Sequence, residues 1–151
     1  MTSEGAHVKR FLIMCVSAAA TIGISGPAMA EGHWASYWNN VLPQRDTRSW
    51  YDGNSDAVHT KTAFRRCRYD GGSPTLRYIT MQLTYENTWT PDENVKTWNS
   101  YCNTTSWVTY DHGDVKRGDY HMTLMGADGS DYVPNYIDVG SSSTTGIDVV
   151  Y

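Results

Sequence analysis

The 151-residue sequence has little positive charge, few cysteines and no long apolar run. Lysine and arginine number 12 against 16 aspartate and glutamate residues, giving a net charge of −4. This balance excludes a general electrostatic nucleic-acid binder, because phosphate binding needs clustered lysine and arginine. The longest apolar stretch covers residues 11–24. It is too short to cross roughly 30 Å of hydrocarbon, so we expect no membrane anchor.

The first 30 residues have the three-part order of an export signal. Lys9 and Arg10 precede the apolar stretch, and Ser25-Gly26-Pro27 ends it. Ala28-Met29-Ala30 then supplies the small-x-small pattern that signal peptidase accepts. We therefore predict a signal peptide over residues 1–30 and a secreted, extracellular protein. Its mature part would carry 10 basic and 15 acidic residues, a net charge of −5.

Only two cysteines, Cys67 and Cys102, follow the predicted signal. Two cysteines allow one intramolecular pairing, and a disulfide persists outside the cell. Closing the loop between them should remove denatured-state entropy worth roughly 3–4 kcal/mol. Reactive or metal-binding thiols are the alternative, but the wide separation without a CxxC motif argues against them. We predict a Cys67–Cys102 disulfide between two strands.

Helix signals are nearly absent after residue 30. The segments are short, rich in Thr, Tyr, Val and Trp, and separated by Gly, Asp, Asn and Pro. Strict alternation of apolar and polar residues, clearest from Ile79 to Tyr85, indicates strands with one buried face. Within residues 58–69, Phe64 and Cys67 have opposite parity, which predicts a bulge or break near Arg65-Arg66. The other expected strands are 49–51, 76–86, 95–102, 104–111, 119–126, 132–139 and 146–151.

Seven or eight strands about ten residues apart predict an all-β domain. We expect two packed antiparallel sheets, an immunoglobulin-like or related sandwich with one disulfide, and a small barrel is the alternative. The domain organisation is then a signal peptide (1–30), an N-terminal arm (31–48) and a β-sandwich (49–151). Leucine and isoleucine are scarce, so tryptophan and tyrosine must fill much of the core.

The arm carries Trp34, Tyr37 and Trp38 without any alternation. One interpretation is a leading segment folded over the sandwich that buries its own rings. The other is an extended aromatic peptide that inserts into a protein partner, since Trp and Tyr dominate binding hot spots. We expect the second, with Trp34, Tyr37 and Trp38 as the partner-binding residues.

No catalytic, cofactor or metal motif stands out. His33, His59, His112 and His121 lie in no local pattern with a known mechanism, so we predict no enzyme and no catalytic residue. His121 lies on the strand face opposite Tyr120 and Met122, which predicts exposure to solvent. The densest group of possible metal ligands flanks a turn, where aspartate is common for another reason, so we predict no metal site and no cofactor. This group comprises Asp111, His112, Asp114, Asp119 and His121.

Two other binding functions stay open. Exposed tryptophans on a secreted sandwich can stack on sugar rings, and Trp89, Trp98 and Trp107 are the candidates. Trp98 and Trp107 alternate toward the core, so only Trp89, beside the turn at Thr90-Pro91, is expected to stay exposed. The segment around Thr90-Pro91-Asp92 could also be the rigid loop of a protease inhibitor. Arg65, Arg66 and Arg68 receive no role from the sequence.

Residues 48–56 (Arg-Ser-Trp-Tyr-Asp-Gly-Asn-Ser-Asp), the cysteine pair and Gly118-Asp119-Tyr120-His121-Met122 together resemble a group of small exported proteins from filamentous actinobacteria. The resemblance covers roughly residues 48–151 and implies a disulfide-bonded β-sandwich without catalytic residues. Some such proteins are similar to the adaptor subunits of umbrella-shaped toxin particles, which bind other secreted subunits partly through an N-terminal arm. The resemblance therefore implies a secreted, non-catalytic adaptor that binds protein partners.

Overall fold

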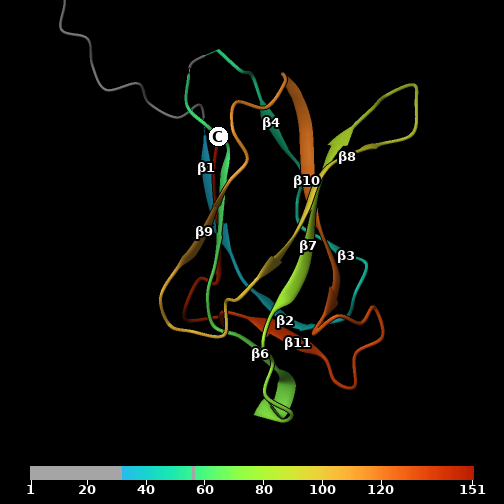
Figure 1. Ribbon diagram of the computed structural model, residues 1–151. Coiled ribbons are helices and arrows are strands. Elements are labelled where there is room, and N and C mark those ends of the chain that lie inside the picture. The colour runs from blue at the N-terminus through green and yellow to red at the C-terminus, as the bar shows by residue number, and fades with distance from the viewer. Residues whose placement is uncertain (1–31, 56) are drawn as a thin grey trace, which may run out of the picture.

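The computed structural model describes residues 32–55 and 57–151, and the predicted signal peptide lies outside them (Figure 1). The described chain is built of antiparallel strands with one short 3₁₀ turn, η1 (Asp70–Gly72). No helix in this part is long and apolar enough to span a membrane. The strands are β1 (His33–Ser36), β2 (Trp38–Val41), β3 (Arg45–Asp46), β4 (Trp50–Asp52), β5 (Lys61–Phe64), β6 (Cys67–Tyr69), β7 (Ile79–Glu86), β8 (Glu93–Ser100), β9 (Val108–Asp111), β10 (Gly118–Ala127), β11 (Ile137–Val139) and β12 (Ile147–Val150).

The strands form two layers, as expected for a sandwich. One layer is a sheet of order β3-β10-β7-β8, in which β4 also pairs with β10. The other contains a sheet of order β1-β12-β5-β9 and a smaller sheet of order β2-β11-β6. The smaller sheet lies at the lower end of the molecule in Figure 1 and continues the same three strand paths, so the two sheets are one interrupted layer.

The interruption, which we call the junction, crosses all three strand paths. It comprises Tyr37, Arg65-Arg66 and the segment Gly140–Gly146. Arg66 has a left-handed φ of 56°, and this turn lets Phe64 and Cys67 both point inward despite their opposite parity. A Cβ on Gly146 would lie 2.2 Å from the Gly140 nitrogen. The backbone at these two positions therefore approaches more closely than a residue with a side chain would allow. The break predicted at Arg65-Arg66 is confirmed.

Alternating residues of both layers face each other in the core. Phe64, Met81, Leu83, Met122, Leu124 and Ile147 are fully buried. Tyrosine and tryptophan supply the remaining volume, since the Trp50 ring lies 6.1 Å from Tyr120 and 5.8 Å from Trp34. The inward face predicted along β7 and β10 is confirmed, since Met81 and Leu83 of β7 and Tyr120, Met122 and Leu124 of β10 are all fully buried.

Two predicted strands begin four or five residues later than the sequence suggested. The strand expected from residue 104 begins only at Val108, because Thr104 Oγ1 donates to the Ser106 carbonyl in a turn. The strand expected from residue 132 begins only at Ile137, after a loop that contains Pro134. Proline cannot donate to a sheet ladder, which accounts for the late start.

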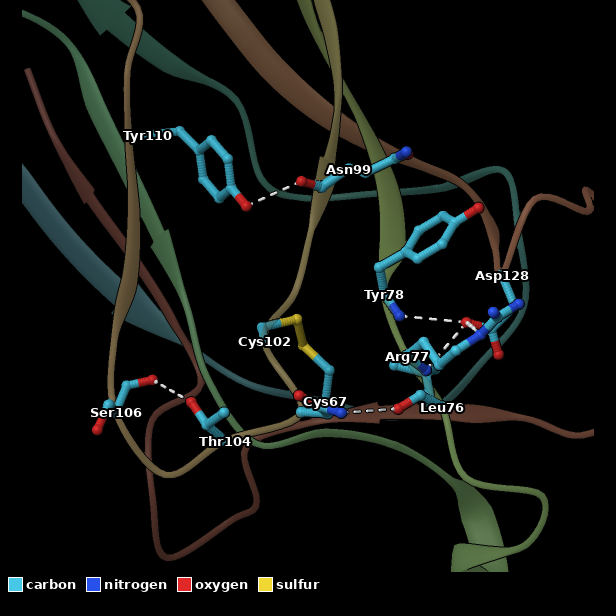
Figure 2. Close-up of a disulfide and its surroundings, with 11 residues drawn as sticks. Cys67, Leu76, Arg77, Tyr78, Asn99, Cys102, Thr104, Ser106, Tyr110 and Asp128 are labelled. Atoms are coloured by element: carbon cyan, nitrogen blue, oxygen red, sulfur yellow. Dashed lines mark hydrogen bonds and ion pairs between the residues drawn. A yellow bond between two sulfur atoms is a disulfide. The ribbon is translucent and has the colours of Figure 1, made fainter.

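The predicted disulfide is present and joins the two layers. Cys67 begins β6 and Cys102 follows β8, and both are buried. The Cys67 nitrogen also donates to the Cys102 carbonyl at 2.8 Å. Figure 2 shows a second connection between the layers, where the Tyr110 hydroxyl of β9 donates to the Asn99 carbonyl of β8 at 2.8 Å. The two layers are therefore tied along the edge formed by β8 and β9.

The segment predicted to be a free arm is part of both layers. β1 pairs with the last strand, β12, and β2 pairs with β11. β3 pairs with β10 through Asp46 and Thr123. The domain therefore begins by residue 33 rather than at residue 49, and the expectation of a separate arm over residues 31–48 is corrected.

Candidate binding site

The loop between β7 and β8, residues 87–92, carries the most exposed large side chain among the described residues. The Trp89 side chain is 93% exposed, as the sequence predicted. The Asn87 nitrogen donates to Asp92 Oδ1 at 3.0 Å, and Asn87 Nδ2 donates to the Pro91 carbonyl at 3.2 Å. These two bonds close the loop on itself, and Figure 1 shows that it projects from the body of the molecule.

The base of this loop is held by charge and aromatic contacts. Lys116 Nζ lies 2.5 Å from Glu93 Oε2 and 3.8 Å from the centroid of the Tyr85 ring. Tyr85 and Glu93 are cross-strand partners in β7 and β8, and Tyr85 packs edge-on against the buried Tyr120. A braced loop presents its tip with little loss of conformational entropy on binding, which favours affinity.

The structure removes Trp34 and Trp38 from the predicted partner-binding surface. Their side chains are only 5% and 7% exposed, and both belong to the core. Arg48 covers the Trp34 ring at 5.0 Å. Tyr37, at 41% exposed, is the only one of the three rings that a partner could contact. The idea that the tryptophan rings enter a partner's groove is therefore corrected, because they fill the domain's own core.

The other two tryptophans considered as sugar-stacking candidates, Trp98 and Trp107, differ in their exposure to solvent. Trp98 is buried as expected, between Phe64 and Tyr110. Trp107 was expected in the core but is 37% exposed, because it lies in the turn before β9 rather than within a strand. The Arg65 guanidinium covers it at 4.1 Å from the ring centroid.

Arg65, Arg66 and Arg68, near Cys67, make contacts with different parts of the fold and form no common basic surface. Arg65 packs on Trp107 and donates to the Thr145 carbonyl at 2.9 Å. Arg68 pairs with the buried Asp138 at 3.1 Å. Arg66 supplies the left-handed turn of the junction.

The predicted candidate metal ligands are not gathered at one point. Asp111 accepts from the Gly113 nitrogen and pairs with His59, whereas His121 faces Glu86 across the sheet. Within residues 32–55 and 57–151, no three His, Cys, Asp or Glu side chains are grouped as metal ligands would be.

His121 has the surroundings closest to those of a catalytic base. Its side chain is 16% exposed, so the predicted solvent exposure is corrected, and its Nδ1 lies 2.8 Å from Glu86 Oε1. The Ser49 hydroxyl donates to the same Glu86 oxygen rather than to the imidazole. The group therefore lacks the hydroxyl–imidazole hydrogen bond that activates a serine nucleophile.

His112 is largely buried against Trp98, with their ring centroids 4.7 Å apart. Its Nε2 lies 2.8 Å from Thr62 Oγ1, while Nδ1 is buried and has no hydrogen-bond partner among the described residues. Burial, reinforced by the positive charge of Lys96, lowers the pKa of His112 from 6.5 to about 4.

This shift predicts acid destabilisation. Between pH 6.5 and about 4 the unfolded chain protonates His112 while the folded chain does not, so stability falls as the pH drops through this window. The full loss amounts to roughly 3 kcal/mol. We expect His112→Gln to remove most of this contribution, measured by urea unfolding at pH 7 and pH 4.5. Exposed His33→Gln is the control, and an unchanged pH dependence in His112→Gln would contradict the assignment.

The residues that carried the resemblance to exported actinobacterial proteins have structural roles. Gly118–Met122 lie in β10, and residues 50–52 form β4 beside them. Asp52 is buried and accepts a hydrogen bond from Thr60 Oγ1 at 2.6 Å. Comparisons of this chain with protein-family models, with curated proteins and with solved structures find no match.

Proposed function

We propose that this chain is an exported, non-catalytic module that binds a protein partner through the loop of residues 87–92. The observation that carries the proposal is the 93% exposed Trp89 side chain on a loop closed by its own hydrogen bonds. Tryptophan is enriched among residues that dominate binding energy, and leaving its large apolar surface in water is unfavourable. The disulfide is compatible with an oxidising compartment outside the cell.

A protein partner suits this loop better than a glycan does. The loop projects from the molecule, so its tip fits a groove in another protein rather than surrounding a small ligand (Figure 1). Sugar sites need polar groups converging around the ring, and Thr88, Thr90 and Asp92 lie along a convex turn. A convex, braced loop also suits a protease inhibitor, with Thr90-Pro91-Asp92 as the contact segment, and this is the second candidate.

The test compares Trp89→Ala with Tyr132→Ala, since Tyr132 is 87% exposed on a different loop. Each mature protein is immobilised and exposed to culture supernatant of the producing organism, and recovered proteins are identified by mass spectrometry. The recovered partner is then purified and titrated. We expect Trp89→Ala to weaken its binding by about 30-fold or more, the effect of losing a hot spot of about 2 kcal/mol. Tyr132→Ala should leave the affinity unchanged.

Three readouts separate the candidates. A partner lost only in Trp89→Ala supports the protein-binding module. Slower substrate cleavage by a protease in the presence of the wild-type chain, abolished by substitution of Asp92, supports the inhibitor. Equal partner affinity of wild-type and Trp89→Ala proteins overturns the assignment of the binding loop. Melting curves for both variants should match the wild type, because both rings are exposed.

A further inference from the structure

A second surface lies around the turn Leu42-Pro43-Gln44, which joins β2 to β3. A hollow of about 460 Å³ lies on one side of this turn, and Tyr136, Asn39, Asn40 and Arg45 contribute to its lining. A hollow of about 420 Å³ lies on the other side, lined in part by Tyr132 and Asp131. Both volumes fall in the range of small-molecule sites.

The turn is held in one conformation by bonds to the layers beneath it. Asn40 and Gln44 both have left-handed backbones, with φ values of 52° and 70°. The Asn40 nitrogen donates to Asp138 Oδ1 at 3.0 Å, and Asp138 is itself buried and paired with Arg68. The Gln44 nitrogen donates to the Leu124 carbonyl at 2.6 Å. Unfavourable conformations that are held in this way concentrate at ligand sites.

The loop that carries the two tyrosines is also fixed. Ser130 Oγ donates to the Tyr132 carbonyl at 2.7 Å and accepts from the Tyr132 nitrogen at 3.1 Å. Asn135 Nδ2 donates to the Ser73 carbonyl at 2.7 Å. The backbone is therefore pinned while the Tyr132 and Tyr136 rings stay 87% and 50% exposed.

The side chains around the turn have hydrogen-bonding groups to spare. Across residues 32–55 and 57–151, no hydrogen bond or ion pair engages the side-chain amides of Asn39, Asn40 and Gln44 or the Arg45 guanidinium. An amide offers donors and acceptors in one plane, and a tyrosine ring offers a flat apolar face. A ligand that binds to the amides and also packs on the tyrosine ring must have hydroxyl groups along its edge and an apolar face.

From this arrangement we propose that the hollows beside Leu42-Pro43-Gln44 form a saccharide-binding site. A sugar ring stacks on Tyr136, with the amides of Asn39, Asn40 and Gln44 bonding its hydroxyl groups. The next sugar extends over the turn toward Tyr132. No carboxylate lines the hollow beside Tyr136, so Arg45 gives it a preference for an acidic sugar such as a uronic acid.

The site is separate from the Trp89 loop. Glu86, next to the loop, pairs with Asp119 at one end of β10, whereas Ile79 pairs with Ala127 at the other. The loop of residues 131–136 follows that second end, so the two surfaces lie at opposite ends of the β7–β10 pair. One module can thus hold a protein at one end and a glycan at the other.

The experiment is an array of neutral and uronic-acid-containing oligosaccharides probed with the mature chain, followed by calorimetric titration of the strongest binder. We expect Tyr136→Ala to weaken binding at least tenfold. Arg45→Gln should weaken binding to the acidic glycans by a similar factor while sparing neutral ones. Trp89→Ala is the matched control and should bind every glycan as the wild type does, so this result is independent of the partner captured by the loop.

The outcomes are decisive in both directions. Binding that is lost in Tyr136→Ala but kept in Trp89→Ala supports the proposal, provided that the two variants melt at the wild-type temperature. Absence of any glycan binding by the wild-type chain at millimolar concentration overturns it. So does glycan binding that Tyr136→Ala leaves intact, or loss of a protein partner rather than a glycan when Tyr132 and Tyr136 are substituted.

Discussion

Deletion of residues 31–47 is expected to abolish cooperative unfolding of the domain. The deletion removes β1, β2 and β3, and with them the buried rings of Trp34 and Trp38. β12 and β11 would then lose the strands that they pair with, β1 and β2, and their edges would become exposed. A domain of this size has only about 5–15 kcal/mol of stability, which the loss of two buried tryptophans alone would nearly exhaust. Thermal melting by circular dichroism measures the effect.

Point variants show whether the loss of stability in the deletion comes from the buried rings or from shortening the chain. Trp34→Ala should cost roughly 3–5 kcal/mol, because its ring lies 5.8 Å from Trp50 inside the core. Tyr37→Ala, only one position before β2 but 41% exposed, should change stability little. If the truncated protein melted like the full chain, the segment would be detachable, and insertion into a partner would again become the better hypothesis.

Removal of the disulfide has the second-largest expected effect. The bridge closes a loop of 35 residues, and opening it should lower stability by roughly 3–4 kcal/mol through the entropy of the denatured chain. We expect the double variant Cys67→Ala, Cys102→Ala to melt roughly 10 °C or more below the wild type. Differential scanning calorimetry of the two proteins provides the comparison.

The same bridge should resist reduction in the folded protein. Cys67 and Cys102 are 2% and 0% exposed, so a thiol reductant reaches them only after local opening. Dithiothreitol should therefore reduce the bridge slowly in buffer and quickly in urea, as followed by thiol alkylation and mass spectrometry. Equal rates in the two conditions would show that the fold does not shield the sulfur atoms, and an unchanged melting temperature in the double variant would show that the bridge adds little stability.

Local alternation was enough to predict the central strands. β7 and β10 are long, and their apolar residues stand at alternate positions and are fully buried, so the core faces could be assigned from Ile79, Met81, Tyr120 and Met122 alone. The break at Arg65-Arg66 was predictable for the same reason, since a period of two conflicts with two inward residues of opposite parity. These signals are all contained within about ten consecutive residues.

The N-terminal strands could not be predicted in this way. β1 and β2 have four residues each, and their partners β12 and β11 lie about 100 residues later in the chain. Four residues are too few to show alternation, and a pairing over that distance leaves no local mark. The burial of the Trp34 ring depends on Trp50, which only the fold brings beside it.

The two candidate surfaces differ in the same respect. Trp89 was predicted to be exposed because it adjoins a turn signal, and one short loop contains everything needed for that inference. The saccharide site instead combines residues 39–45 with residues 131–136, and no sequence pattern links them. The sequence predicts a strand from Tyr132, whereas the structure places this residue in the loop before β11.

The junction at Tyr37, Arg65-Arg66 and Gly140–Gly146 has a consequence for how this protein can diverge. A strand shifted by one residue normally turns its whole buried set toward water. Here all three strand paths are interrupted at the same level, and the left-handed turn at Arg66 resets the parity of the path from β5 to β6. A length change within the junction can therefore be absorbed there without propagating into the aromatic core. The end that holds Leu42-Pro43-Gln44 is thus free to drift in sequence and length, and ligand preference can evolve there without unfolding the rest.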